Sequence, residues 1–334
     1  MPIAEIPLVQ RIARASRAAL PGVRRSARAR VLQSIGDDCA VLSAAPGSQL
    51  LVTTDFSIEG VHFRREWHPA DSVGHRCLTR GLSDIAAMGG EPVAAFLSLA
   101  LPAGLPQRWA DQFFEGLLAT AKRAGVTLAG GDLSQSPAGV LADIAVVGTV
   151  AEGRAILRST AAPGDRIFVS GELGAPYALL ERMYAMPKRR FRAASYPAHF
   201  YPQAQLALAR YLAEMQIPSA MIDISDGLSI DLARLCRASR VGATLHAKAI
   251  PIASLNRHEV ELRHALHGGD EYQLLFTVPL GRRPPKRYRG VPLTLIGYIT
   301  EGDEVSIEYE NGYTTDLEPL GWEHFTNERR KKRR

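Results

Sequence analysis

Short apolar runs rich in β-branched residues alternate along the first half of the chain with longer segments whose apolar residues recur at helical spacing. Gln49–Thr54 and Val93–Leu101 are runs of the first kind, and we predict that both form strands, the second one buried. Asp71–Met88 is a segment of the second kind. It stops at Gly89-Gly90, a pair suited to a helix C-terminus, so we predict a helix there.

The alternation continues beyond this helix. Pro106 is predicted to open a second long helix, because proline favours the first helical position, and Gly125 to close it. The further predicted strands are Val126–Ala129, Leu141–Val150, Arg166–Ser170, Met221–Ile224, Gln273–Val278 and Pro292–Tyr298. The further predicted helices are Pro202–Met215 and Leu228–Ala238. This order favours an α/β or α+β chain of two domains, residues 1–150 and 151–326, followed by a basic tail at 327–334.

The composition of the 334 residues is typical of a globular protein, with 46% hydrophobic and 22% charged residues. No apolar run approaches the roughly 18 residues that a membrane-spanning helix needs. The three cysteines, Cys39, Cys77 and Cys236, lie far apart and form no CxxC pair. These observations argue against membrane, secreted and zinc-finger proteins, and favour the reducing cytoplasm.

The net charge of +6 at first suggests a partner that is a polyanion. Residues 329–334 are all Arg or Lys and carry six positive charges, so the rest of the chain is close to neutral. A terminal run of this kind is expected to be a solvated, disordered tail, and we do not expect binding to nucleic acid. The N-terminus is also rich in arginine, which resembles a transit peptide in composition, but Ile6, Val9 and Ile12 keep a helical spacing. We therefore expect a docked first helix.

Aspartates recur at predicted strand ends and beside glycines. The clusters are Gly36-Asp37-Asp38-Cys39-Ala40, Thr53-Thr54-Asp55, Leu82-Ser83-Asp84, Gly130-Gly131-Asp132, Asp223-Ile224-Ser225-Asp226-Gly227 and Gly268-Gly269-Asp270-Glu271. Each cluster taken alone is better explained as a turn or a helix cap. Asp84 and Asp223 are exceptions, because each interrupts an apolar stretch where an unpaired carboxylate is costly to bury.

Carboxylates combined with threonine hydroxyls suit hard cations such as Mg²⁺. A reaction that needs many of them is phosphoryl transfer from ATP to an acceptor that is itself phosphorylated, because several cations then offset the repulsion between two anions. Such an acceptor brings its own ionised oxygen, so we expect no covalent nucleophile and assign no catalytic residue of that kind. The chain has no GxxxxGK[ST], GxGxxG, HRD or DFG motif, which argues against the common ATP-binding folds.

The clusters, in this order, resemble those of the thiamine-monophosphate kinases, which belong to the ATP-binding superfamily that includes aminoimidazole ribonucleotide synthetase. Two further strings strengthen the resemblance, Glu59-Gly60-Val61-His62-Phe63 and the continuation of the Asp84 cluster to Gly89. It extends from about residue 5 to residue 325. The resemblance implies two domains of PurM-like architecture, with N-terminal strands that form a barrel shared by a homodimer and a C-terminal α/β sandwich. It also implies ATP and Mg²⁺, and the conversion of thiamine monophosphate to thiamine diphosphate.

The resemblance also implies roles for individual residues. The implied Mg²⁺ ligands are Asp38, Thr53, Thr54, Asp55, Asp84, Asp132, Asp223 and Asp226. The implied nucleotide contacts are Gly131, Asp132, Arg158 and Ser225, and the implied substrate contacts are His62, Asp270 and Trp322. The alternative for Arg158 is a surface ion pair, and for His62 and Trp322 it is simple packing. An indole face suits the cationic thiazolium of thiamine, and a guanidinium suits a phosphate oxygen.

The chain departs from the family pattern at three places in its second half. The family usually has Gly-Gly-Glu-Asp-Tyr where this chain has Gly268-Gly269-Asp270-Glu271-Tyr272, so either Asp270 or Glu271 is the acid that contacts the substrate. Residues 171–175 lack the usual Asp-Ser-Ala string, and residues 199–205 contain no arginine. These departures affect the expected handling of the acceptor more than that of ATP.

Two alternatives remain open. One is another member of the same superfamily that acts on a different phosphorylated or carboxylated acceptor. The other is a nucleotide-binding regulator without turnover that uses its basic tail to bind nucleic acid. Salt-sensitive nucleic-acid binding that disappears when residues 329–334 are deleted would indicate the regulator. The complete set of oxygen ligands at the predicted metal positions argues against it.

Overall fold

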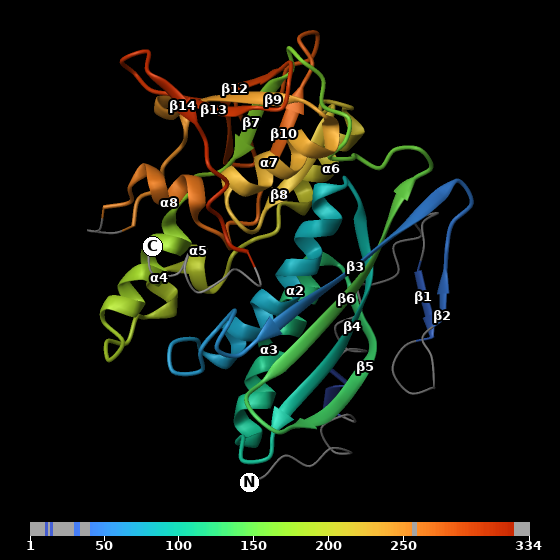
Figure 1. Cartoon of the computed structure of the whole chain (residues 1–334). Coiled ribbons are helices and arrows are strands. Elements are labelled where there is room, and N and C mark those ends of the chain that lie inside the picture. The colour runs from blue at the N-terminus through green and yellow to red at the C-terminus, as the bar shows by residue number, and fades with distance from the viewer. Residues whose placement is uncertain (1–10, 13, 16–29, 34–40, 256–258, 324–334) are drawn as a thin grey trace. The chain divides into compact units, whose positions relative to one another are not determined.

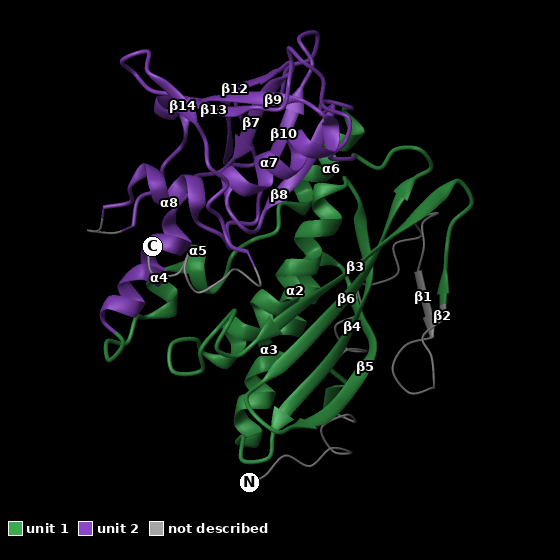
Figure 2. Ribbon diagram, viewed as in Figure 1, with its two compact units in different colours: residues 1–156, 187–215 green, residues 157–186, 216–334 purple. Residues whose placement is uncertain are grey.

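The computed structural model describes residues 11–12, 14–15, 30–33, 41–255 and 259–323, and it is a mixed α+β protein (Figure 1). The chain divides into two compact units (Figure 2). Unit 1 comprises residues 1–156 and 187–215, and unit 2 comprises residues 157–186 and 216–334. The predicted two-part α+β organisation is therefore present, and the segment 187–215 belongs to unit 1.

Unit 1 is built on a four-stranded sheet in the order β3-β6-β4-β5. The strands are β3 (Ser48–Ile58), β4 (Glu91–Pro102), β5 (Thr127–Ser136) and β6 (Leu141–Ala151). β6 pairs antiparallel with β3 and β4, whereas β4 and β5 are parallel and are joined by a helical crossover. β1 (Arg30–Gln33) and β2 (Val41–Ser43) form a separate antiparallel pair.

Two long helices, α2 (Ala70–Ala87) and α3 (Gln107–Ala124), pack against each other, and α2 also packs on β3, β4 and β6. The close approach of the helices depends on glycine. A Cβ at Gly74 would lie 1.9 Å from the carbonyl oxygen of Phe113, and one at Gly116 would lie 1.9 Å from that of Asp71. Gly125 ends α3 in the left-handed conformation. Both helix predictions are confirmed.

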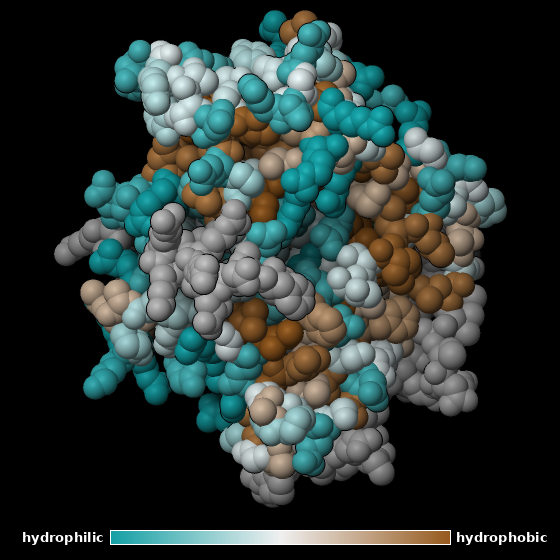
Figure 3. Space-filling model, viewed as in Figure 1, coloured by the Kyte–Doolittle hydropathy of each residue, from teal (hydrophilic) through white to brown (hydrophobic). Residues whose placement is uncertain are grey.

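The other face of this sheet carries exposed apolar side chains. Leu50, Val52 and Phe56 alternate along β3 with inward-facing residues and are 53%, 67% and 51% exposed. Figure 3 shows hydrophobic surface over this part of unit 1. Exposed large apolar side chains on one face of a sheet are typical of a surface that a partner covers.

The segment 187–215 carries η1 (Ala193–Ser195), α5 (Pro197–Phe200) and α6 (Leu206–Glu214), and it is held to α2 by hydrogen bonds from buried polar side chains. Ser72 donates to the carbonyl oxygen of Phe200, and His75 Nε2 lies 2.6 Å from that of Pro202. The helix predicted at Pro202–Met215 begins later, at Leu206. The earlier residues present main-chain carbonyl groups to α2 instead of forming a helical turn.

Unit 2 contains an eight-stranded sheet whose main path is β14-β13-β9-β12-β7-β10-β8, with β11 paired to β12. The strands are β7 (Arg166–Ser170), β8 (Ala220–Ile224), β9 (Gly242–His246), β10 (Gln273–Val278), β11 (Arg287–Tyr288), β12 (Val291–Thr300), β13 (Val305–Glu308) and β14 (Thr314–Asp316). The helices are α4 (Ala175–Ala185), α7 (Leu228–Ser239), η2 (Ala247–Ala249) and α8 (Leu262–His267). The pairs are antiparallel except β13–β9.

Each unit has its own hydrophobic core, and the cysteines of the described part, Cys77 and Cys236, are free and buried in these cores. Across the described residues, no helix combines the length and the hydropathy that a membrane crossing would need. The cytoplasmic location stays a prediction. The basic tail and Cys39 lie outside the described residues, as does most of the predicted first helix, of which Ile12 is buried.

Candidate functional site

The loop Ser225–Gly227 lies between the end of β8 and the start of α7, and its backbone joins four of the predicted site residues of unit 2. The N–H of Asp270 donates to the carbonyl oxygen of Ser225 at 2.7 Å. The N–H of Trp322 donates to the carbonyl oxygen of Asp226 at 2.8 Å. Ser225, Asp226, Asp270 and Trp322, which come from three distant parts of the sequence, are therefore neighbours.

Asp223 and Trp322 lie close to this loop but differ in their surroundings. Asp223 is in β8, as predicted, and only 6% of its surface is exposed. Trp322 is 44% exposed, so its indole is accessible to a ligand. Its neighbour Gly321 permits the close contact with the loop, because a Cβ there would lie 2.4 Å from the carbonyl oxygen of Asp226.

A buried carboxylate, Asp231, accepts hydrogen bonds from the N–H groups of the loop. The distances from its Oδ2 to the nitrogens of Ser225, Asp226 and Gly227 are 3.2, 3.0 and 3.1 Å. Arg234 Nη1 donates to Asp226 Oδ2 at 2.5 Å and to Asp231 Oδ1 at 2.7 Å. Burial, together with the nearby Asp226 carboxylate, raises the pKa of Asp231 to about 6, so Asp231 is ionised at neutral pH.

Asp270 and Glu271, the two candidate acids, differ in their environment. Asp270 is partly exposed and accepts a 2.7 Å hydrogen bond from the hydroxyl of Tyr272. Both Asp270 and Tyr272 have positive φ angles, 63° and 51°, which are strained for residues with a Cβ and are typical of functional sites.

The side chain of Glu271 is turned into the protein. It is 6% exposed, and its Oε1 accepts a 2.5 Å hydrogen bond from the N–H of Gly174, at the start of α4. Burial raises the pKa of Glu271 to about 8. Asp270 is thus the acid that a ligand can reach, and Glu271 supports the start of α4.

In unit 1, the predicted ligands of β3 and α2 lie together. Thr53 Oγ1 donates to Asp84 Oδ2 at 2.5 Å, which places both side chains between the sheet and α2. Asp55, two residues further along β3, faces the same side, and its Oδ1 lies 3.7 Å from Nη1 of Arg80. β3 continues to Ile58, so the expectation that Asp55 ends the strand is wrong.

The predicted turn at Gly130-Gly131-Asp132 is also wrong, because β5 continues through these residues to Ser136. Asp132 pairs in register with Ser98 of β4, and both residues are exposed. Thr54 is exposed as well and points to the face opposite Thr53. The unit 1 candidates therefore occupy both faces of the sheet.

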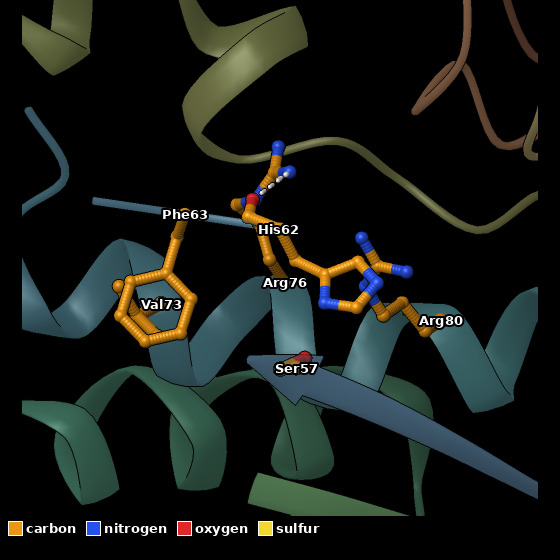
Figure 4. Close-up of a pocket in the computed structure, with 6 residues that line it drawn as sticks. All are labelled: Ser57, His62, Phe63, Val73, Arg76 and Arg80. Carbon is orange, nitrogen blue, oxygen red and sulfur yellow. Dashed lines mark hydrogen bonds between the residues drawn. The ribbon is translucent and has the colours of Figure 1, made fainter. Parts of the chain in front are cut away.

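His62 lies in a small pocket lined by Ser57, His62, Phe63, Val73, Arg76 and Arg80 (Figure 4). Its Nδ1 accepts a 2.9 Å hydrogen bond from the N–H of Ile58, so a neutral His62 carries its proton on Nε2. Arg76, which is 4% exposed, donates to the carbonyl oxygens of His62 and His199. Two guanidinium groups beside an imidazole give this pocket a basic character.

The remaining predicted residues are not brought into these groups. Arg158 is exposed. The carbonyl oxygen of its neighbour Leu157 accepts a hydrogen bond from the N–H of Met221, which places Arg158 near the start of β8. The Ser225–Gly227 loop follows the other end of that strand. Asp38 lies outside the described residues. In the part of the chain that the structure describes, no group of three or more His, Cys, Asp or Glu residues is arranged to hold a metal ion.

Asp231 and Arg234 were not among the predicted site residues. Both lie in α7, and an acid in the first turn of a helix usually indicates nothing more than a favourable interaction with the helix dipole. Their three-residue spacing places them on one face of the helix. The direction of the Asp231 side chain, towards the loop, is a property of the folded chain.

Carboxylate and hydroxyl side chains on a chain of two α+β units are consistent with the AIR synthase related proteins. The AIR synthase related protein, N-terminal domain, matches residues 36–150, and the corresponding C-terminal domain matches residues 162–310. A thiamine-monophosphate kinase of Synechococcus elongatus is 34% identical over 304 residues, which are 87% of this chain and 91% of the relative.

Similar solved structures belong to the same group of proteins. A thiamine-monophosphate kinase of Stenotrophomonas maltophilia K279a has a TM-score of 0.78 at 32% identity and covers 92% of this chain and 97% of its own. AaThiL complexed with AMPPCP and TMP has a TM-score of 0.75 at 31% identity, with coverages of 85% and 89%. The chain belongs to the thiamine-monophosphate kinase family.

Proposed function

We propose that this chain transfers the γ-phosphoryl group of ATP to thiamine monophosphate, forming thiamine diphosphate and ADP. An ionised oxygen of the acceptor phosphate attacks the γ-phosphorus, and the bond from that phosphorus to the β,γ-bridging oxygen breaks. No proton has to be removed from the acceptor, so the chain needs no general base. The observation that carries the proposal is the contact of Asp270 and Trp322 with the Ser225–Gly227 loop.

The residues of this loop region have chemistry suited to the substrates. The exposed indole of Trp322 offers a face for the thiazolium cation, and the Asp270 carboxylate offers an acceptor for the donors of thiamine. Ser225, Gly131, Asp132 and Arg158 are proposed nucleotide contacts, and His62 a proposed substrate contact.

The donor set fits Mg²⁺, because it consists of carboxylate and hydroxyl oxygens such as those of Thr53 and Asp84, which lie 2.5 Å apart. Bound Mg²⁺ would neutralise charge on the triphosphate and on the transferred group. The proposed ligands are Asp38, Thr53, Thr54, Asp55, Asp84, Asp132, Asp223 and Asp226. Thr53 and Arg80 hold Asp84 and Asp55 in place on the α2 side of the sheet.

We also propose that the chain acts as a homodimer whose N-terminal sheets form a shared barrel. The exposed Leu50, Val52 and Phe56 on the sheet face opposite α2 support this assembly. Val52→Asp would place a charge in the interface, so sedimentation should detect monomers. A Val52→Asp protein that remains as associated as the wild type would contradict the proposal.

The reaction is tested by incubating the purified chain with ATP, Mg²⁺ and thiamine monophosphate. We expect thiamine diphosphate and ADP in equal amounts, and no product when EDTA removes the metal. ATP binding without thiamine diphosphate would indicate another acceptor, and the Asp270-Glu271 pair would be the first place to look for the difference.

A further inference from the structure

Three consecutive main-chain N–H groups, those of Ser225, Asp226 and Gly227, point to a single buried oxygen, Oδ2 of Asp231. Asp231 is 1% exposed. Burying a carboxylate costs several kcal/mol unless its charge is balanced by hydrogen bonds or a cation, and here both are present.

Asp231 binds both the end of its own helix and the residues before it. α7 begins at Leu228 and Gly227 is its N-cap, so the bond from the Gly227 N–H satisfies a donor at the helix end. The bonds from the N–H groups of Ser225 and Asp226 join the carboxylate to residues that precede the helix, whereas the N–H of Asp231 makes the ordinary helical bond to the carbonyl oxygen of Gly227. The carboxylate therefore fixes the loop to the start of α7.

The loop is held from both sides of its backbone. Its N–H groups are bound by Asp231, and its carbonyl oxygens are bound by the N–H groups of Asp270 and Trp322. Arg234 adds a link from Asp231 to the Asp226 carboxylate, with distances of 2.7 and 2.5 Å. A change at Asp231 is therefore transmitted to Ser225 and Asp226 directly, and to Asp270 and Trp322 through the loop.

We propose that Asp231 is a positioning residue, which holds the Ser225–Gly227 loop in the conformation that binds the magnesium nucleotide, and that Arg234 orients the Asp226 carboxylate from the same anchor. This inference rests on the proposed function, and it assigns to two residues of α7 a role that does not require contact with ATP or the acceptor. Because Asp231 satisfies the loop N–H groups internally, the loop presents side-chain oxygens to its ligand.

The test compares Asp231→Asn with a matched control, Asp165→Asn. Asp165 is also a buried carboxylate of unit 2, 5% exposed, whose Oδ2 accepts hydrogen bonds from the N–H of Ala162 and the hydroxyl of Ser219. None of these partners belongs to the Ser225–Gly227 loop. Both substitutions replace a buried carboxyl group of unit 2 with a carboxamide of the same size, so the change in side-chain chemistry is matched.

Two quantities are measured on the full-length chain: the affinity for AMPPCP with Mg²⁺ by calorimetry, and hydrogen exchange of peptides that span residues 225–227. We expect Asp231→Asn to weaken binding roughly tenfold or more and to speed exchange in the loop, because charge-assisted hydrogen bonds to the loop N–H groups are replaced by weaker neutral ones. Asp165→Asn should leave both unchanged. Unaltered affinity or unaltered exchange in a folded Asp231→Asn protein overturns the proposal.

If Asp231→Asn does not fold, the AMPPCP affinity of Arg234→Gln tests the proposal instead. Arg234 is 35% exposed, so its replacement is tolerated more easily, and we expect weaker AMPPCP binding with the fold intact. Wild-type affinity in Arg234→Gln would then overturn the proposal. Failure of the proposed function looks different: the wild-type chain would form no thiamine diphosphate, while the exchange of the loop would still respond to Asp231→Asn.

Discussion

The main-chain N–H of Trp322 donates a 2.8 Å hydrogen bond to the carbonyl oxygen of Asp226, although the two residues lie in opposite parts of the second half of the sequence. This bond places an exposed indole next to a loop that carries two proposed nucleotide and metal ligands. The aromatic face and the carboxylates therefore keep a fixed relation, which a direct transfer between two bound phosphates requires.

Trp322→Ala should raise the KM for thiamine monophosphate about 5- to 30-fold, because a cation–π contact contributes about 1–2 kcal/mol. The KM for ATP should change little, and Trp322→Phe should restore most of the acceptor affinity. Steady-state kinetics with each substrate varied in turn measures the effect. The control is Tyr313→Ala, which removes another exposed aromatic ring of unit 2. Equal effects of Trp322→Ala on both substrates would count against the acceptor assignment.

Asp84→Asn should lower kcat by roughly a hundredfold or more, because electrostatic stabilisation of the transferred group is lost. The carboxamide oxygen can still accept the hydroxyl of Thr53, so the thermal stability should change little. Asp132→Asn is expected to behave in the same way. Asp111→Asn, an exposed aspartate of α3, is the control. Wild-type turnover in both Asp84→Asn and Asp132→Asn would contradict the proposal that these two aspartates bind Mg²⁺.

Asp270→Asn and Glu271→Gln should differ, although the residues are adjacent. Glu271 has a pKa of about 8 and is mainly uncharged at neutral pH, so glutamine replaces it with the same shape and charge, and activity should be close to that of the wild type. Asp270→Asn removes an accessible charge, and the KM for thiamine monophosphate should rise roughly tenfold. The opposite order of effects would identify Glu271 as the acid that contacts the substrate.

The stability of the protein should fall in mild acid because of His75. Burial is the main cause that lowers the pKa of His75 from 6.5 to about 4, and the positive charges of Arg123 and Arg76 lower it as well. The hydrogen bond to Pro202 and the negative charge of Asp71 raise the pKa but do not offset these effects. Below pH 6.5 the unfolded chain takes up a proton that the folded chain binds only near pH 4. Stability is thus fully present above pH 6.5 and is lost as the pH falls towards 4, by up to about 3 kcal/mol.

Urea unfolding at pH 7.0, 5.5 and 4.5 measures this loss. His75→Gln cannot be protonated but can still donate to the carbonyl oxygen of Pro202, so its stability should depend less on pH over the same range. An identical pH dependence in the wild type and His75→Gln would show that other groups are responsible.

The strong periodic segments could be predicted from the sequence, because their apolar spacing depends only on local geometry. The helix at Asp71–Met88 matches α2, and the strand with Asp223 matches β8. The ends of the strands depend on pairing as well as on local spacing. β3 and β5 extend past Asp55 and Asp132 because cross-strand pairing with β6 and β4 continues there, and the sequence contains no sign of that pairing.

The sequence by itself determined the family, the oxygen-only character of the candidate ligands and the absence of a known nucleotide-binding loop motif, because these depend on residue types and their order. Only the tertiary structure decided that Asp270 is accessible and Glu271 is buried, that Thr53 rather than Thr54 faces Asp84 of α2, and that Asp231 anchors the Ser225–Gly227 loop. These outcomes depend on where side chains point and on which backbone groups of distant segments meet. Both are fixed by long-range packing and pairing, which residue order alone does not specify.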